Sequence, residues 1–245
     1  MSNIFIIWRR ELGSYFASPL AYVFIIIFLA LSAGTTFYLG AFLERGQADL
    51  SVFFSFHPWL YLFLIPSVAM RLWAEERKAG TLEFLMTLPV STGETVVGKY
   101  LAAWAFTGVA LALTFPIWIT VNYLGDPDNG VIFASYIGSW LMAGGFLASG
   151  ACMSALTKSQ VIAFVLAATA CFLFLMMGLD LVLAFFQGWA PEAVVAQIAR
   201  FSLLTSFQSI SQGVIDIRDA IFFLTLIGVC LFINTAIIEL KKTST

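Results

Sequence analysis

The chain has 245 residues, of which 61% are hydrophobic and 11% charged, and its formal net charge is -2. Soluble domains carry roughly 25% charged residues, so this composition excludes a soluble globular domain. The near-neutral charge, with no basic cluster, gives no indication of nucleic-acid binding. A membrane-crossing helix needs around 20 apolar residues, and the chain divides into six such runs. We therefore expect an all-α integral membrane protein with six transmembrane helices and no room for a soluble catalytic domain.

Residues 1–18 have apolar positions at three- and four-residue steps, interrupted by Arg9, Arg10 and Glu11. The segment lacks the uninterrupted apolar core of a signal peptide. Its spacing predicts an amphipathic helix at the membrane interface, which ends before Pro19. The spans predicted after it, in chain order, are 20–43, 53–72, 100–124, 131–156, 161–186 and 220–238.

The longest charged island of the chain lies between the second and third predicted spans, at 73–90. It begins with two glutamates followed by Arg77 and Lys78, and the apolar residues after them are spaced so that most fall on one side of a helix. Pro89 ends this helix because its ring clashes with the preceding turn. Two interpretations stay open: an amphipathic helix that offers its charged side to a soluble partner, or a solvated loop with a helical turn.

The distribution of lysine and arginine predicts the orientation, because basic residues are retained on the cytoplasmic side of a membrane. With both termini in the cytoplasm, nine basic residues fall in inner segments: Arg9, Arg10, Arg71, Arg77, Lys78, Lys99, Lys158, Lys241 and Lys242. The outer segments hold Arg45, Arg200 and Arg218. This orientation places 73–90 in the cytoplasm and the segment 187–218, which has mixed polarity, outside.

The run from Gly93 to Lys99 has the spacing of a phosphate-binding P-loop as far as its lysine. Tyr100 stands where a P-loop has the Ser or Thr that holds Mg²⁺, and no strand precedes the run. A P-loop needs a strand–loop–helix frame to direct its backbone N–H groups at phosphates. We therefore expect no nucleotide site here, and any ATP that the protein uses is hydrolysed by another chain.

Asp180 is the one acid well inside an apolar run, where a charge costs roughly 2.5–3.5 kcal/mol. It either lines a substrate path or gate, or lies near the outer end of the fifth span, hydrogen-bonded to 187–218. The single His57 is weak support for metal or proton chemistry, so a structural role is expected. The three cysteines lie in apolar runs and are interpreted as small apolar residues, so no metal site is predicted.

Four segments of the chain resemble the signature of ABC-2 type transporter permeases: Met70–Pro89, Gly98–Ala102, Leu156–Phe164 and Phe207–Asp219. Within that class the chain is most similar to the gliding-motility permease branch. The resemblance implies a six-span permease of the bacterial inner membrane that works as a homodimer. It also implies an amphipathic N-terminal helix, a cytoplasmic coupling helix after the second span, and short external helices between the fifth and sixth spans. ATP and Mg²⁺ are implied only on a separate cytoplasmic ATP-binding subunit.

The resemblance assigns the coupling helix to 73–90. The residues expected to couple it to the ATP-binding subunit are Glu75, Glu76, Arg77, Gly80, Thr81, Glu83 and Leu85. In this hypothesis the glutamates pair with basic residues of that subunit, and Gly80 allows a close approach or a bend. The alternative is that these carboxylates are merely solvated.

Three classes of function follow from this pattern. We expect the permease of an ABC exporter, which has no catalytic site of its own. A secondary transporter or channel would show inverted repeats and several intramembrane charges, whereas the sequence has only Asp180 and no evident repeat. The third class is a membrane anchor for a periplasmic machine, in which ATP hydrolysis does mechanical work and nothing is translocated. An auxiliary periplasmic or membrane-anchored protein could then bind 187–218.

Overall fold

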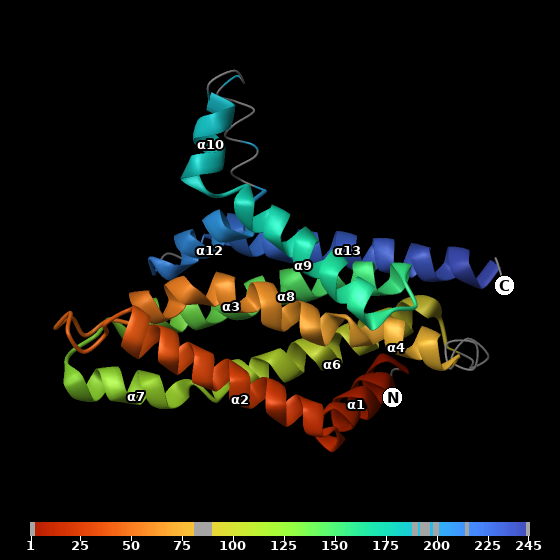
Figure 1. The fold of residues 1–245 in the computed structure, drawn as a ribbon, viewed down its shortest axis with the longest axis horizontal. Coiled ribbons are helices and arrows are strands. Elements are labelled where there is room, and N and C mark those ends of the chain that lie inside the picture. Colours follow the sequence, from red (N-terminus) through yellow and green to blue (C-terminus); the bar gives the residue numbers. More distant parts are fainter. Residues whose placement is uncertain are drawn as a thin grey trace.

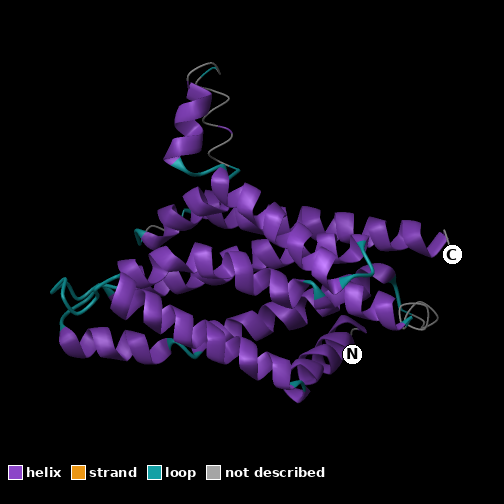
Figure 2. Ribbon diagram, viewed as in Figure 1, coloured by secondary structure: helices purple, strands orange, loops and turns teal. Residues whose placement is uncertain are grey.

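The computed structural model of the protein describes residues 3–80, 90–187, 191, 197, 201–213 and 216–243. Over these residues the chain forms helices joined by turns and loops, without a strand. Most helices lie along one long axis as a bundle, and the short helix α10 projects from its side (Figures 1 and 2). The predicted all-α fold is therefore confirmed for the described part of the chain.

The helices have the following bounds: α1 Asn3–Ala17, α2 Pro19–Gly34, the π-helical turn η1 Thr35–Leu39, α3 Ser51–Ala69, α4 Arg71–Ala79, α6 Thr92–Ala112, α7 Phe115–Leu124, α8 Asn129–Leu156, α9 Gln160–Met176, α10 Asp180–Gln187, α12 Leu203–Ser211 and α13 Ile217–Thr243. Among the described residues, five helical stretches are long and apolar enough to cross a membrane: Pro19–Leu39, Ser51–Ala79, Thr92–Leu124, Asn129–Leu156 and Ile217–Lys241. They correspond to the first, second, third, fourth and sixth predicted spans.

The prediction that 161–186 forms one continuous helix is wrong. Helix α9 ends at Met176, and the amides of Gly178 and Leu179 bond to carbonyls three residues back, which tightens and ends the helix. A new helix, α10, begins at Asp180. Asp180 is exposed in its first turn, where a carboxylate interacts favourably with the positive end of the helix dipole. Helix α9 is apolar and has 17 residues, the lower limit of what spans a bilayer.

Helix α8 is the centre of the bundle. It contacts α3, α4, α6, α9, α12 and α13, and most of its length is buried. Small residues such as Gly144, Gly150 and Ala155 line its surface, so that neighbouring backbones approach closely. A polar side chain on α8 also joins it to α3 by hydrogen bonds. The Ser139 hydroxyl lies 2.7 Å from Nδ1 of His57 and 2.8 Å from the Tyr61 hydroxyl, both on α3. His57 is fully buried, which agrees with the predicted structural role.

Two tryptophans join α6 to α8 by reciprocal hydrogen bonds. The Trp104 indole Nε1 donates to the carbonyl oxygen of Trp140 at 2.9 Å, and Trp140 Nε1 donates to the Trp104 carbonyl oxygen at 3.2 Å. Their rings are stacked, with centroids 4.4 Å apart and planes inclined by 18°. We call this pair the tryptophan clasp. Both indole donors are thereby satisfied although Trp140 is 37% exposed on the surface of the bundle, as apolar surroundings require.

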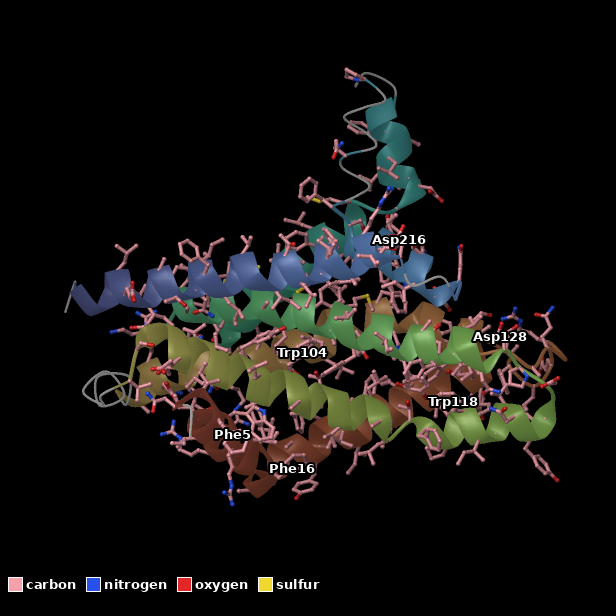
Figure 3. The ribbon with its side chains drawn as sticks, turned by 180° about the vertical axis from the view of Figure 1, so that it is seen from behind. Phe5, Phe16, Trp104, Trp118, Asp128 and Asp216 are labelled. Carbon is pink, nitrogen blue, oxygen red and sulfur yellow. The ribbon has the colours of Figure 1, made fainter. Side chains whose placement is uncertain are left out.

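The two ends of the bundle carry different charges. Helix α4, the start of α6, the α8–α9 turn and both termini lie at one end (Figure 1). The basic residues of these segments include Arg71, Arg77, Lys99, Lys158 and Lys241. The loops before α3 and between α7 and α8 lie at the opposite end and carry Asp49, Asp126 and Asp128, the last of which is labelled in Figure 3. We call the end that holds α4, the start of α6, the α8–α9 turn and both termini the basic end.

Helix α4 continues from α3 after one intervening residue, Met70. The hydroxyl of Ser154 on α8 holds this junction, because it accepts hydrogen bonds from the amides of Trp73 at 3.2 Å and Ala74 at 3.1 Å. It also donates to the Met70 carbonyl at 2.9 Å. The amides at the start of a helix have no partner within that helix, so a buried α4 N-terminus depends on this hydroxyl. The break between α3 and α4 therefore lies at Met70, before the predicted start of the charged island at Trp73.

Replacing Ser154 with alanine should destabilise the protein, because it leaves buried backbone groups without a partner at a cost of about 1–3 kcal/mol. The measurement is thermal unfolding in a neutral detergent, followed by circular dichroism. Ser149→Ala is the matched control, since Ser149 is also buried on α8 and its hydroxyl donates to Gly145 of its own helix. Equal stability of the two variants would contradict the role assigned to Ser154.

Candidate functional site

A buried lysine connects three helices at the basic end of the bundle. Lys99 lies on α6, and only 4% of its side chain is exposed. Its ammonium Nζ lies 3.1 Å from Oε2 of Glu11 on α1 and 2.5 Å from Oε1 of Glu76 on α4. The same nitrogen is 5.6 Å from the centre of the Trp73 ring, within range of a cation–π interaction. One positive charge therefore binds α1, α4 and α6 together, and we call this group the Lys99 cluster.

The energetics of the Lys99 cluster follow from its burial. An ammonium removed from water loses several kcal/mol of hydration, which is offset only when charges of the opposite sign contact it directly. Glu11 and Glu76 supply two such charges, and their side chains are 17% and 18% exposed. Removing one partner of a buried ion pair typically costs about 3–5 kcal/mol, because the remaining charge is then uncompensated. Separation of α1 or α4 from α6 would leave the ammonium uncompensated in the same way unless water entered.

Further ion pairs surround the cluster. Arg10 Nη2 lies 2.7 Å from Glu11 Oε1, and Arg71 donates to both oxygens of Glu75 at 2.8 and 3.3 Å, one turn apart on α4. A crevice of about 190 Å³ runs between these residues, and Glu11, Arg71 and Glu75 are in its wall. The outer pairs are more exposed than Lys99, so they contribute less, about 0–1 kcal/mol each.

The start of α6 places Lys99 in this position. Ser91 and Glu94 form a capping box: the Ser91 hydroxyl accepts from the Glu94 amide, and the Glu94 carboxylate accepts from the Ser91 amide. The Asn3 side chain of α1 donates to both Glu94 oxygens at 3.3 Å, which ties the first residues of the two helices together. A Cβ on Gly98 would lie 2.8 Å from Ile7 Cγ2 and 3.2 Å from the carbonyl oxygen of Ile4. Glycine at this position therefore allows α1 to pack directly on α6.

The ionisation of Glu11 depends on its neighbours. Burial on its own raises the pKa of this carboxyl, but the charges of Lys99 and Arg10 and the hydrogen bonds from both outweigh burial. The net effect holds the pKa of Glu11 below its ordinary value of 4.5. The carboxylate is therefore charged in the native protein at neutral pH, as its contact with Lys99 requires.

Comparison with known proteins decides the family. The sequence profile described as ABC-2 family transporter protein matches residues 20–225, which is most of the chain. The chain belongs to the ABC-2 transporter family. No curated protein matches it. As an ABC-2 family member with several membrane-spanning helices, it is the multi-pass permease component of an ABC transporter, has no catalytic activity of its own and has an ATP-binding subunit as its partner.

The structure places the predicted coupling residues of this permease in different environments. Glu75 pairs with Arg71, and Glu76 points inward to Lys99. Arg77 Nη1 donates to the carbonyl oxygen of Ala155 at 2.9 Å, at the end of α8. These contacts are made within the chain, so pairing of the glutamates with the ATP-binding subunit stays a prediction.

The predicted helix over 73–90 does not run through Gly80. Helix α4 ends at Ala79, and Gly80 has φ 72°, a left-handed conformation that glycine adopts without strain and that commonly terminates helices. The segment 81–89, with Thr81, Glu83 and Leu85, lies outside the described residues. Leu72, Trp73 and Ala74 are buried, so α4 is inserted into the bundle, and Lys78 and Gly80 are exposed at its C-terminal end.

Sequence reasoning missed Lys99 and Glu11 as site residues. It treated Lys99 as the last residue of a false P-loop, and the structure instead places Gly98 and Lys99 within α6. A usable signal was present: a lysine in the apolar run that opens a span needs a carboxylate on a neighbouring segment. The Ser91–Glu94 spacing also indicated that α6 begins before the predicted residue 100.

Replacing Gly98 with alanine should displace α1 from α6, because the new methyl group would overlap Ile7 and approach the Ile4 carbonyl. The expected cost is about 1–3 kcal/mol, as for other overpacked contacts. Hydrogen exchange should show faster exchange of α1 amides. Gly93→Ala is the control, since its Cβ would meet nothing within 4 Å. If α1 exchanges equally in both variants, close contact at Gly98 is not what holds it.

The Glu11–Lys99 contact should make stability depend on pH. Since the native pKa of Glu11 is lowered, its contribution is fully present above about pH 4.5 and is lost as the pH falls through the native value. The measurement compares the Tm of the natural protein with that of Glu11→Gln between about pH 7 and about pH 3. The natural protein should be the more stable at neutral pH, and the difference should disappear in acid. A difference that does not change with pH would contradict this assignment.

Proposed function

We propose that this ABC-2 permease transmits movement of its ATP-binding subunit through α4 and the Lys99 cluster to α1 and α6. The observation that carries the proposal is the Lys99 ammonium, which contacts carboxylates on α1 and α4 from its position on α6. A rigid buried contact between three elements is suited to move them together, because breaking it would leave a charge uncompensated.

In this mechanism the ATP-binding subunit, which holds ATP and Mg²⁺, contacts the exposed end of α4 at Lys78 and Gly80. The residues that follow, among them Thr81, Glu83 and Leu85, extend this contact. Closure of the subunit around ATP displaces α4. The inserted side chain of Trp73, which is 2% exposed, carries the displacement into the bundle, and the Lys99 cluster carries it to α1 and α6.

The proposal includes an orientation with both termini in the cytoplasm of a bacterium and the permease in its inner membrane. Its support is the excess of basic residues at one end of the bundle, where lysine and arginine outnumber those of the opposite end, since cytoplasmic segments retain lysine and arginine. The basic end also holds α4 and the Lys99 cluster. A cytoplasmic basic end therefore places the proposed contact on the same side of the membrane as the ATP-binding subunit.

We further propose that two copies of the permease act as a homodimer, as sequence resemblance to ABC-2 permeases implies. The coupled movement serves export of a substrate or mechanical work on an auxiliary protein at the outer face. Both uses need the same transmission through α4, and they differ in whether a molecule crosses the membrane.

Two substitutions distinguish binding of the ATP-binding subunit from transmission of its movement into the permease. Lys78→Glu should weaken binding of the ATP-binding subunit, measured as a higher Kd, because it reverses a charge at the exposed end of α4. Lys99→Gln should leave that binding intact and reduce the permease-dependent ATP hydrolysis of the assembled complex on the order of tenfold, since coupling between sites is commonly worth 1–3 kcal/mol. Lys99→Arg keeps the charge and should retain partial coupling.

The matched control for Lys78→Glu is Lys158→Glu. Lys158 is exposed in the α8–α9 turn at the same end of the bundle, and it lies off α4. Equal weakening by the two substitutions would show a general charge effect and would remove α4 as the contact. Normal coupled ATP hydrolysis in a folded Lys99→Gln complex would overturn transmission through the cluster.

A further inference from the structure

A cavity of about 500 Å³ opens at the end of the bundle opposite the Lys99 cluster. It lies between the first turns of α3 and α8 and the helix α12. Its volume falls in the range of cavities that hold small molecules, about 300–1,000 Å³. The inner wall is apolar and includes Phe54, Pro58, Ile132, Leu204 and Phe207. A cavity of this size and lining is suited to an apolar molecular body.

The mouth of the cavity is polar and acidic. Asp49 and Asp128 are part of its lining, and each uses Oδ1 for a local hydrogen bond: Asp49 accepts from the Ser51 amide, and Asp128 accepts from the amides at the start of α8. Among the described residues of the lining there is no lysine, arginine or histidine. The mouth therefore has two carboxylates and no basic side chain from the described lining. Their two negative charges outweigh the partial positive charge of about half a unit at each of the α3 and α8 N-termini, so the potential of the mouth favours cations.

An aromatic side chain adds to this preference. Trp59 lines the same cavity and is 41% exposed. An indole face attracts ammonium groups, by about 0.5–1 kcal/mol at exposed sites. Gln208 and Gln212 of the lining add amide oxygens that accept hydrogen bonds. The apolar wall thus suits the apolar part of a ligand, and the acidic mouth suits a positively charged part.

We infer that this cavity binds an amphiphile with an apolar body and a cationic nitrogen head, with the body against Phe54 and Phe207 and the head near Asp49, Asp128 and Trp59. A head with a net negative charge would be repelled by both carboxylates. The inference is independent of the proposed coupling role, because the cavity shares no residue with the Lys99 cluster. Binding can therefore be measured on the permease without its ATP-binding subunit.

The test is equilibrium dialysis of the purified full-length permease in neutral detergent with radiolabelled 3-phenylpropyltrimethylammonium. The uncharged competitor has a tert-butyl group in place of the trimethylammonium group, so shape is matched and charge is removed. Asp49→Asn combined with Asp128→Asn removes both charges, while asparagine still accepts the local hydrogen bonds and caps α8 as well as aspartate does. Ser55→Phe fills the cavity from an exposed lining position, and Thr120→Phe, on exposed α7 surface outside the lining, is its control.

Saturable binding should weaken about tenfold in the double asparagine variant, as expected for the loss of two partly exposed charges. It should disappear in Ser55→Phe and persist in Thr120→Phe. Displacement of the probe by a short-chain phosphatidylethanolamine would assign the site to a membrane lipid, and absence of displacement would assign it to a free amphiphilic amine; both outcomes support the inference. Equal competition by the uncharged analogue, or unchanged binding in Ser55→Phe, would overturn it.

Discussion

The ammonium of Lys99 is the constraint on which the basic end of this permease depends. A charge that is 4% exposed must be met by carboxylates, and the chain brings one from α1 and one from α4. The glycine at position 98 and the capping box at the start of α6 then become necessary, because α1 has to lie close enough for Glu11 to reach. Apolar packing determines which faces meet, and the ion pairs determine how these helices are positioned along one another.

Composition was sufficient to predict most of the fold. Apolar runs of about 20 residues have few alternatives to a membrane helix, because every backbone group must bond within its own segment. The structure differs from the prediction where a local backbone conformation ends a helix that the sequence pattern continues. Hydrogen bonds around Gly178 end α9 at Met176, although the sequence stays apolar beyond this residue. The left-handed Gly80 ends α4, although the helical spacing of apolar residues continues beyond it.

The candidate site was only partly predictable. Glu75, Glu76 and Arg77 were recognised as a charged island, but their partners belong to distant parts of the sequence, and periodicity contains no information about such pairs. Lys99 was missed because its spacing from Gly93 imitates a phosphate loop. In the structure Gly98 permits close contact with Ile7, and Lys99 binds two carboxylates, so neither residue needs a phosphate to explain it.

The tryptophan clasp has a consequence for how α6 and α8 can move. Each indole bonds to the main chain of the opposite helix, so a slide of one residue, about 1.5 Å, or a rotation of about 100° would break both bonds at once. Inside a bilayer no water replaces them. The clasp therefore fixes the register of the two helices, and α6 and α8 tilt as one body. Trp104 follows Lys99 by less than two turns, so in the proposed mechanism a force on the cluster would reach the centre of the bundle without slippage between α6 and α8.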